Sequence, residues 1–307
     1  MLLRLIADAL FVRGHGLLQA GHALRALPQL ALAARLSGSN PYYFATAAAA
    51  ASQAGDRERA AVLCERALAL DAQFTPAHEL MASLYLHGEK YSALLERIHR
   101  HLRPRTYVEI GVESGASLRL ALPETRALGV DPEPKIAFAL PAGAQLFAQT
   151  SDEFFARPDL GALLGGLPLE LALIDGMHHF EYALRDFMNL ERLCAPGAAI
   201  LIHDVFPHDR TTAQRERVMH FWSGDIWRLV VLLKKYRPGL AIHTIAAPPT
   251  GLALVRNLDP GSRFIADNLE RLCAEFLALD YGYLERDRAG KLNLFPNDWE
   301  RIRPLLG

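Results

Sequence analysis

Two short segments of the chain place an acidic side chain and a histidine close together. Asp175 and His178 stand three residues apart in the first segment, and His203 and Asp204 are adjacent in the second. Two carboxylates that meet in space can share a divalent cation of the oxygen-preferring kind. The pKa of an unperturbed imidazole lies near neutral pH, which suits His178 to act as a general base. Histidines that only cap or pack are the alternative, but the pairing in both segments favours chemistry.

Both segments follow apolar runs that predict the strands of one sheet. Several runs are apolar without alternation, as is typical of parallel strands covered on both faces. We expect helices between the first five strands, which predicts a doubly wound, mostly parallel α/β sheet. Ligands of such sheets bind beyond the carboxyl ends of the strands. The predicted strands are 106–111, 126–131, 144–149, 169–175, 198–204, 241–245 and 252–257.

The first predicted strand ends in a glycine turn that contains an acid. Glu109, Gly111 and Gly115 form the pattern E-x-G-x-x-x-G. Glycines permit a tight turn and close approach of a ligand to the backbone. The pattern differs from the G-x-G-x-x-G of dinucleotide sites, which speaks against a nucleotide-dependent oxidoreductase. Glu109 can supply a negative charge beside a cationic group of a ligand, and a plain structural turn is the alternative.

The second and third predicted strands also end in polar residues. Asp131 follows the second strand, where an acid can accept hydrogen bonds from the ribose hydroxyls of a nucleoside. We prefer this role to a simple helix cap because the glycine turn precedes Asp131 by one expected helix and one strand. Ser151 and Asp152 follow the third strand. They either reach an adenine amine or only cap the next helix, and both interpretations stay open.

Residues 1–102 are rich in Ala and Leu and predict helices throughout. Gly21, Gly55 and Gly88 recur at spacings of 34 and 33, and an alanine follows each glycine by five residues. Such a period predicts helix pairs joined by glycine turns. The segment resembles tetratricopeptide repeats, with Pro76 opening a helix. The alanines are Ala26, Ala60 and Ala93.

The helical pattern ends at Pro104, which predicts an all-α domain over 1–102 and a catalytic domain over 103–307. Repeats of this kind present a surface for a protein partner or for self-association. A cap that merely covers the catalytic domain is an equal alternative.

The catalytic half resembles class I S-adenosylmethionine (SAM)-dependent methyltransferases. It is most similar to the metal-assisted O-methyltransferase branch, which includes macrolide-sugar O-methyltransferases and cephalosporin-hydroxylase-like proteins. The resemblance covers about Tyr107 to Asp204 and continues more weakly to Asn257. The resemblance therefore implies a Rossmann-like methyltransferase sheet. Its motifs are VEIGVESGAS, GVD, IDGMHHFEYALRDF and APGAAILIHDV.

The resemblance implies a role for each candidate residue. Asp175 and Asp204 would bind Mg²⁺ or another divalent cation, with His178 as the base, and His203 is either a third ligand or turns away. The sugar methyltransferases carry an acid where this chain has His203, and histidine suits Mg²⁺ poorly. Either the metal differs, its affinity is lower, or none binds. In the cofactor site, Glu109, Gly111 and Gly115 would frame the methionine part of SAM, Asp131 its ribose, and Ser151 and Asp152 its adenine.

The resemblance implies methyl transfer to a hydroxyl of a small-molecule or glycan acceptor, such as a sugar or natural product. The alternative is a degenerate SAM-binding protein whose repeats act as an interaction module. Phe221, Trp222 and Trp227 surround an acid and predict a lid over the site. Core packing is the commoner fate of tryptophan and is the alternative.

The composition excludes several other functions. The 33 Lys and Arg balance the 34 Asp and Glu, so nothing indicates nucleic acid or an anionic membrane surface as a partner. No apolar stretch is long enough to predict a membrane span. The widely separated Cys64, Cys194 and Cys273 are typical of buried thiols in a reducing compartment. We therefore expect a cytoplasmic location.

Overall fold

The structure is a computed structural model that describes residues 2–219 and 221–307. The chain forms two compact units. The first contains Met1–Leu86 and Arg217–Trp222, and the second contains His87–Glu216 and Ser223–Gly307.

The first unit consists of helices joined by short turns. Gly21 and Gly55, two of the three periodic glycines, lie in the turns after α1 and α3 with positive φ angles of 79° and 83°. The predicted glycine turns are thus confirmed. Glycine is favoured at these positions because a positive φ angle is costly for other residues. Ala26 and Ala60 are fully buried, as close helix packing requires. The helices are α1 (Leu2–Gln19), α2 (Ala23–Ser37), α3 (Pro41–Gln53), α4 (Arg57–Leu70) and α5 (Thr75–Tyr85).

Helix α6 (Tyr91–Leu102) belongs to the second unit, although we predicted it as part of the repeats. Leu94, Leu95 and Ile98 on this helix are fully buried in the core that covers the sheet. The unit boundary therefore lies at Leu86, before the boundary that Pro104 suggested. The helical period of α6 resembles that of the preceding helices, so its sequence does not reveal which core it joins.

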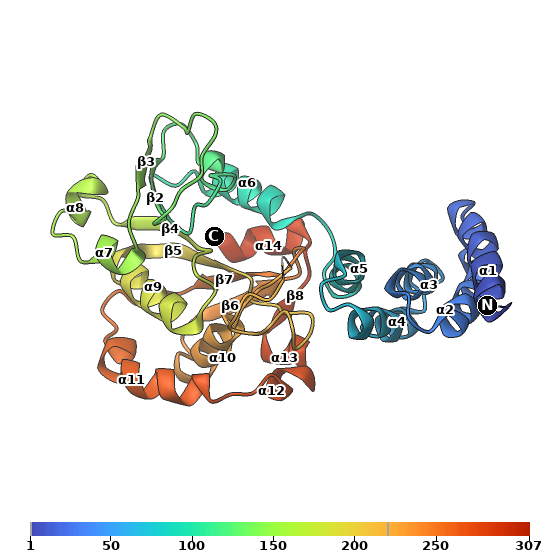
Figure 1. Ribbon diagram of the computed structural model, residues 1–307. Helices are drawn as coiled ribbons and strands as arrows, with labels where there is room; N and C mark the ends of the chain where they lie inside the picture. The colour runs from blue at the N-terminus through green and yellow to red at the C-terminus, as the bar shows by residue number, and fades with distance from the viewer. Residues whose placement is uncertain (1, 220) are drawn as a thin grey trace. The chain divides into compact units, whose positions relative to one another are not determined.

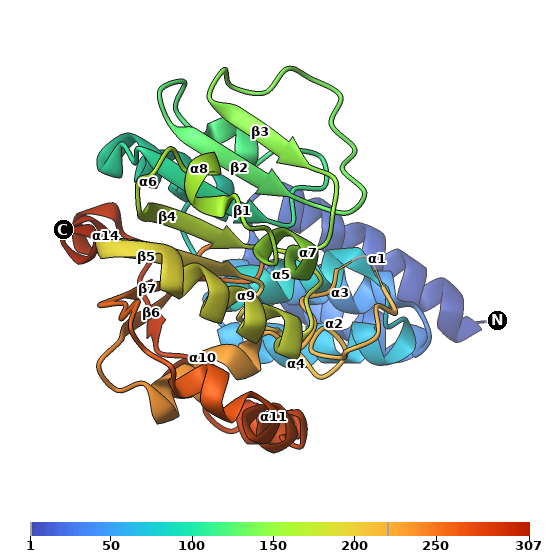
Figure 2. The same ribbon diagram turned by 90° about the vertical axis from the view of Figure 1, so that its left-hand side faces the viewer.

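The second unit is built on one sheet, which has eight strands among the described residues, in the order β3-β2-β1-β4-β5-β7-β6-β8. Figure 2 shows this order from β3 to β6. All neighbouring strands are parallel except where β7 pairs with β5 and β6. The predicted mostly parallel α/β sheet is therefore confirmed. The strands are β1 (Thr106–Ile110), β2 (Arg126–Val130), β3 (Ala144–Phe147), β4 (Leu169–Ile174), β5 (Cys194–His203), β6 (Ala241–Ile245), β7 (Leu252–Arg256) and β8 (Leu294–Phe295).

The expected alternation of strands and helices is wrong in the first half of the sheet. Only the short 3-10 helix η1 (Leu118–Leu120) lies between β1 and β2, and the fully described segment between β2 and β3 contains no helix. Pro132 and Pro134 explain the latter, because proline lacks the donor that a helix interior needs. Among the segments that join the first five strands, only the one between β4 and β5 contains a long helix, α9 (Phe180–Leu193). The segment between β3 and β4 carries two short helices, α7 (Ser151–Phe155) and α8 (Leu160–Leu163).

Helices cover both faces of the sheet (Figure 1). Helices α6 and α14 pack on one face with the side chains of Tyr107, Leu171 and Leu201. Helix α9 packs on β4 and β5 across the other face, together with α10 and α11. The remaining helices are α10 (Trp227–Tyr236), α11 (Phe264–Leu277), α12 (Gly282–Glu285), α13 (Arg288–Lys291) and α14 (Trp299–Leu306).

No helix in the described part of the chain is both long and apolar enough to cross a membrane.

Candidate functional site

The carboxyl ends of β1 and β4 lie side by side at the centre of the sheet. The Asp175 amide donates to the Ile110 carbonyl at 2.8 Å. A Cβ atom built on Gly111 would lie 2.1 Å from the Asp175 carbonyl oxygen. Glycine is therefore required at position 111 because two protein turns meet there. The predicted tight turn at Gly111 is confirmed, while its contact with a ligand stays a prediction.

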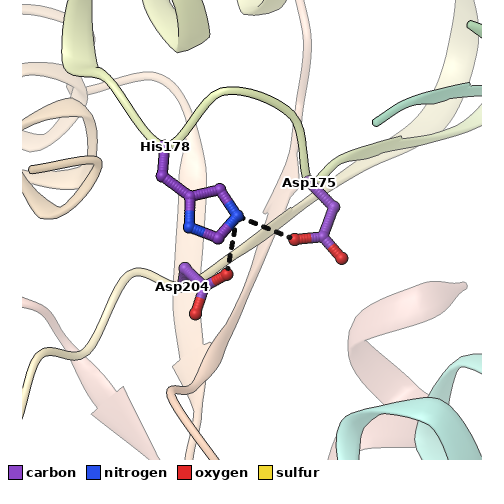
Figure 3. A group of neighbouring side chains, drawn as sticks. All are labelled: Asp175, His178 and Asp204. Atoms are coloured by element: carbon purple, nitrogen blue, oxygen red, sulfur yellow. Dashed lines mark ion pairs between the residues drawn. The ribbon is translucent and has the colours of Figure 1, made fainter. Parts of the chain in front are cut away.

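A cluster of two carboxylates and an imidazole lies at the carboxyl ends of the central strands, as Figure 3 shows. His178 Nε2 lies 3.2 Å from Asp204 Oδ2 and 3.6 Å from Asp175 Oδ1. The three residues come from the loop after β4 and the end of β5, which are neighbouring strands. The side chains of His178, Asp204 and Asp175 are 20%, 7% and 15% exposed, respectively. The structure therefore brings Asp175, His178 and Asp204 together, as predicted.

Two members of this cluster have left-handed backbones. The φ angles are 57° at His178 and 58° at Asp204. Such conformations cost about 1–3 kcal/mol and persist where the surrounding structure enforces them. Strained residues cluster at functional sites, so this backbone supports a role beyond packing.

His203 lies beside the two carboxylates. Its Nδ1 is 3.0 Å from both Asp175 Oδ1 and Asp204 Oδ2, and its Nε2 is 3.4 Å from Thr250 Oγ1. The Tyr91 ring stacks on the imidazole with 3.8 Å between ring centroids. His203 thus places an imidazole where the sugar methyltransferases have a carboxylate. The sequence did not point to Tyr91 or Thr250, because they come from α6 and the β6–β7 loop.

The charges of this cluster control its protonation. Burial lowers the pKa of His203, but the carboxylates of Asp204 and Asp175 outweigh burial and raise the pKa to about 10. The pKa of His178 is also raised, since the same two carboxylates overcome its burial. Burial alone would raise the pKa of Asp204, yet the two imidazoles hold it below its ordinary value. The cluster therefore pairs two acids with two bases in a buried setting.

Glu109 lies in a closed hydrogen-bond triad. It is fully buried, and it accepts hydrogen bonds from Tyr107 Oη at 2.7 Å and Ser117 Oγ at 2.6 Å. Burial raises the pKa of Glu109 to about 8, although both hydrogen bonds oppose the shift. The structure thus shows a role for Glu109 in holding the turn after β1. Its predicted contact with a cofactor is a separate matter and stays a prediction.

Asp131 also binds the turn after β1. Its Oδ2 accepts from the amides of Val112 at 3.0 Å and Glu113 at 2.8 Å, and its Oδ1 accepts from the Glu133 amide at 2.8 Å. A carboxylate has about four acceptor positions, so three are filled and one remains. Asp131 is therefore held rigidly at the end of β2 and can accept one further hydrogen bond.

The residues after β3 are engaged with the protein. Thr150 is the residue that caps α7, in a capping box with Glu153. Asp152 accepts two hydrogen bonds from Arg185 on α9, at 2.9 and 2.7 Å. Neither Ser151 nor Asp152 is the helix cap, which removes the structural alternative we considered, while the adenine contact stays a prediction.

The predicted aromatic lid is wrong for Trp227, which is 1% exposed and packs in the core at the start of α10. Phe221 belongs to the first unit, where its ring stacks on His78 with 5.4 Å between centroids. Trp227 therefore follows the commoner fate of core packing, whereas Phe221 and Trp222 are half-buried.

The cluster has a donor set that fits a divalent cation. Among the described residues, Asp175, His178 and Asp204 each offer one ligand atom, and these atoms lie within 4.8 Å of one another. Carboxylate oxygens suit Mg²⁺ or Mn²⁺, while an imidazole suits transition metals such as Zn²⁺ or Fe²⁺. The fit is therefore to a divalent cation that tolerates nitrogen as well as oxygen ligands.

Comparisons with known proteins give one family match and several similar solved structures. Residues 108–205 match a family described as a methyltransferase domain. A similar solved structure is the O-methyltransferase TomG from Streptomyces achromogenes in complex with SAM, with a TM-score of 0.42, 17% identity, and coverage of 54% of this chain and 78% of that chain. The O-methyltransferase from Bacillus cereus in complex with SAH has a TM-score of 0.40 and 13% identity over 60% of this chain and 90% of its own. The MycE methyltransferase of mycinamycin biosynthesis, in complex with Mg and SAH, has a TM-score of 0.40 and 18% identity over 69% of this chain and 63% of its own. A search of curated proteins gave no match.

Proposed function

We propose that this chain is a SAM-dependent methyltransferase that methylates a hydroxyl of a small-molecule or glycan acceptor. One observation carries the proposal. The imidazole of His178 meets the carboxylates of Asp175 and Asp204 at the sheet edge where ligands bind, within the segment that matches a methyltransferase domain.

The turn after β1 and the end of β2 are the proposed cofactor site. The remaining acceptor position of Asp131 fits one ribose hydroxyl, and the carboxylate is already oriented by three backbone amides. Glu109 lies behind the same turn and holds it through its hydrogen bonds with Tyr107 and Ser117. Gly111 and Gly115, with φ angles of 86° and 77°, give the turn its shape. We place the methionine part at this turn and the adenine toward Ser151 and Asp152.

SAM supplies an activated methyl group on a positively charged sulfur. The acceptor oxygen forms a bond to the methyl carbon while the carbon–sulfur bond breaks and its electron pair stays on sulfur, giving S-adenosylhomocysteine. The hydroxyl proton passes to the imidazole of His178. The raised pKa of His178 makes the neutral imidazole a stronger base. Asp175 and Asp204 orient the ring and stabilise the imidazolium that forms.

Asp175 and Asp204 are also the residues that would hold a divalent cation. A bound cation would lower the pKa of the acceptor hydroxyl and fix its position. His203 donates toward both carboxylates and so competes with a cation for them. We therefore expect weaker metal binding than in a site with a third carboxylate.

The first unit is proposed to provide a surface for a protein partner or for self-association, as the resemblance to tetratricopeptide repeats suggests.

Native mass spectrometry of the purified protein tests the proposed function. We expect a bound mass of SAM or S-adenosylhomocysteine after purification or after addition of SAM. A screen of hydroxyl acceptors, followed by release of S-adenosylhomocysteine, then identifies the substrate class. A folded protein that retains neither compound at saturating SAM would overturn the proposal.

A further inference from the structure

The loop that carries His178 is held by a second segment of the same unit. Residues 178–181 lead from the cluster into α9, and each of the four contacts either Arg215 or Asp225. The Asp225 amide donates to the His178 carbonyl at 3.1 Å. His179 Nε2 lies 2.9 Å from the Arg215 carbonyl oxygen. Two residues distant in the sequence thus fix the whole turn.

Asp225 replaces the missing cap of α9. The helix begins at Phe180, and the preceding His179 makes no side-chain cap hydrogen bond. Instead, Asp225 Oδ1 accepts from the Phe180 amide at 2.7 Å. A carboxylate at this end also interacts favourably with the helix dipole. The helix start, and with it the turn that holds His178, is therefore set by Asp225.

The carboxylate of Asp225 is itself fixed by two guanidinium groups. Asp225 is fully buried, and its Oδ2 binds Arg215 Nη1 at 2.6 Å and also Arg228 Nη1. Arg215 binds Glu181 in the first turn of α9 as well, with two hydrogen bonds of 2.9 and 2.7 Å. A buried carboxylate with this many partners has little freedom to move.

Gly224 brings the backbone of this segment directly onto His178. A Cβ atom built on Gly224 would lie 2.0 Å from the His178 carbonyl oxygen, and the φ angle of Gly224 is 65°. The left-handed conformation of His178 needs such enforcement from its surroundings. The Gly224–Asp225 pair supplies it through one close contact and two hydrogen bonds.

We propose that Asp225, together with Arg215, is a positioning residue that sets the orientation of His178 for proton abstraction. Asp225 acts through the turn at 178–181 and reaches no reacting atom itself. The inference rests on the proposed role of His178 as the base. It also gives a function to the acid that the aromatic segment surrounds.

The test compares Asp225→Asn with Glu191→Gln in the full-length protein. Glu191 is a matched control, because it is a buried carboxylate with two hydrogen bonds to Arg237, at 2.8 and 2.7 Å, elsewhere in the same unit. The readout is the proton–nitrogen correlation spectrum of ring-labelled histidines, in which His178→Ala assigns the His178 signals. The spectrum needs neither cofactor nor acceptor.

We expect Asp225→Asn to shift or broaden the His178 ring signals and Glu191→Gln to leave them unchanged. With a hydroxyl that the wild type methylates, Asp225→Asn should lower kcat by about 10²-fold, the cost of a small misplacement, at an unchanged Kd for SAM. Identical His178 signals in wild type and folded Asp225→Asn would overturn the inference. A wild type without SAM binding would overturn the proposed function instead, and the ring signals would still decide the positioning role.

Circular dichroism shows whether Asp225→Asn folds. If it does not, Arg215→Gln takes its place, because the Arg215 side chain is 37% exposed and its replacement leaves less unpaired buried charge. Displaced His178 signals in Arg215→Gln support the inference, and unchanged signals refute it.

Discussion

Replacing Asp131 by Ala tests the proposed ribose contact and the turn that it anchors. The substitution removes a carboxylate that accepts three backbone amide hydrogen bonds and has one acceptor position left. A hydrogen bond to a charged group contributes about 1.5–3 kcal/mol. Loss of a single ribose contact should therefore weaken SAM binding by about 10- to 150-fold.

Isothermal titration calorimetry measures this loss, and the melting temperature reports the effect on the fold. Asp298→Ala is the control, since Asp298 accepts a backbone amide at the start of α14 in a similar way. Asp131→Asn keeps one acceptor oxygen and should lose less affinity than Asp131→Ala. We expect both alanine variants to lose some stability and only Asp131→Ala to lose SAM affinity. An unchanged SAM affinity in folded Asp131→Ala would refute the ribose assignment.

Three further predictions follow from the site and the fold. His178→Ala should reduce turnover by about 10²–10⁴-fold while calorimetry shows nearly unchanged SAM affinity; normal turnover by this variant would refute the assignment of the base. In the fold, the pKa of Glu109 is raised to about 8, above the unfolded value of about 4.3. The protonated Glu109 carboxyl therefore contributes fully to the free energy of unfolding below about pH 4.3, and this contribution is lost as the pH rises through about 8. Glu109→Gln should therefore lose less stability than wild type in urea unfolding between about pH 5 and pH 9, and parallel pH profiles would contradict this. A chain that begins at His87 should stay folded and bind SAM, whereas one that begins at Arg103 lacks α6 and should be unstable in thermal melts, since burial of each large apolar side chain contributes about 1.5–3 kcal/mol; equal stability of the two would contradict the unit boundary.

The strands were predictable because their apolar runs reflect burial within the chain itself. All seven predicted strands match β1 to β7 within a few residues, and only the two-residue β8 was missed. The lack of long helices between β1, β2 and β3 was not predictable from the α/β pattern alone. Prolines after Asp131 prevent a helix there, so a local rule overrides the expected alternation.

The centre of the site was predictable because strand ends of a parallel sheet meet at one edge. Asp175, His178 and Asp204 follow from that rule. Tyr91 and Thr250 did not, because α6 and the β6–β7 loop reach the site only through tertiary packing. Asp225 is the acid that the sequence analysis found among aromatic residues. Its contacts were not predictable, because Phe180 lies far from it in the sequence and no local pattern links it to Arg215.

Calorimetric titration of the full-length protein with SAM, and separately with NADH, tests the central claim most directly. We expect heat of binding that fits one SAM per chain and no measurable binding of NADH. Tighter binding of NADH than of SAM, or no binding of SAM by the folded protein, would contradict the assignment of this chain as a SAM-dependent methyltransferase.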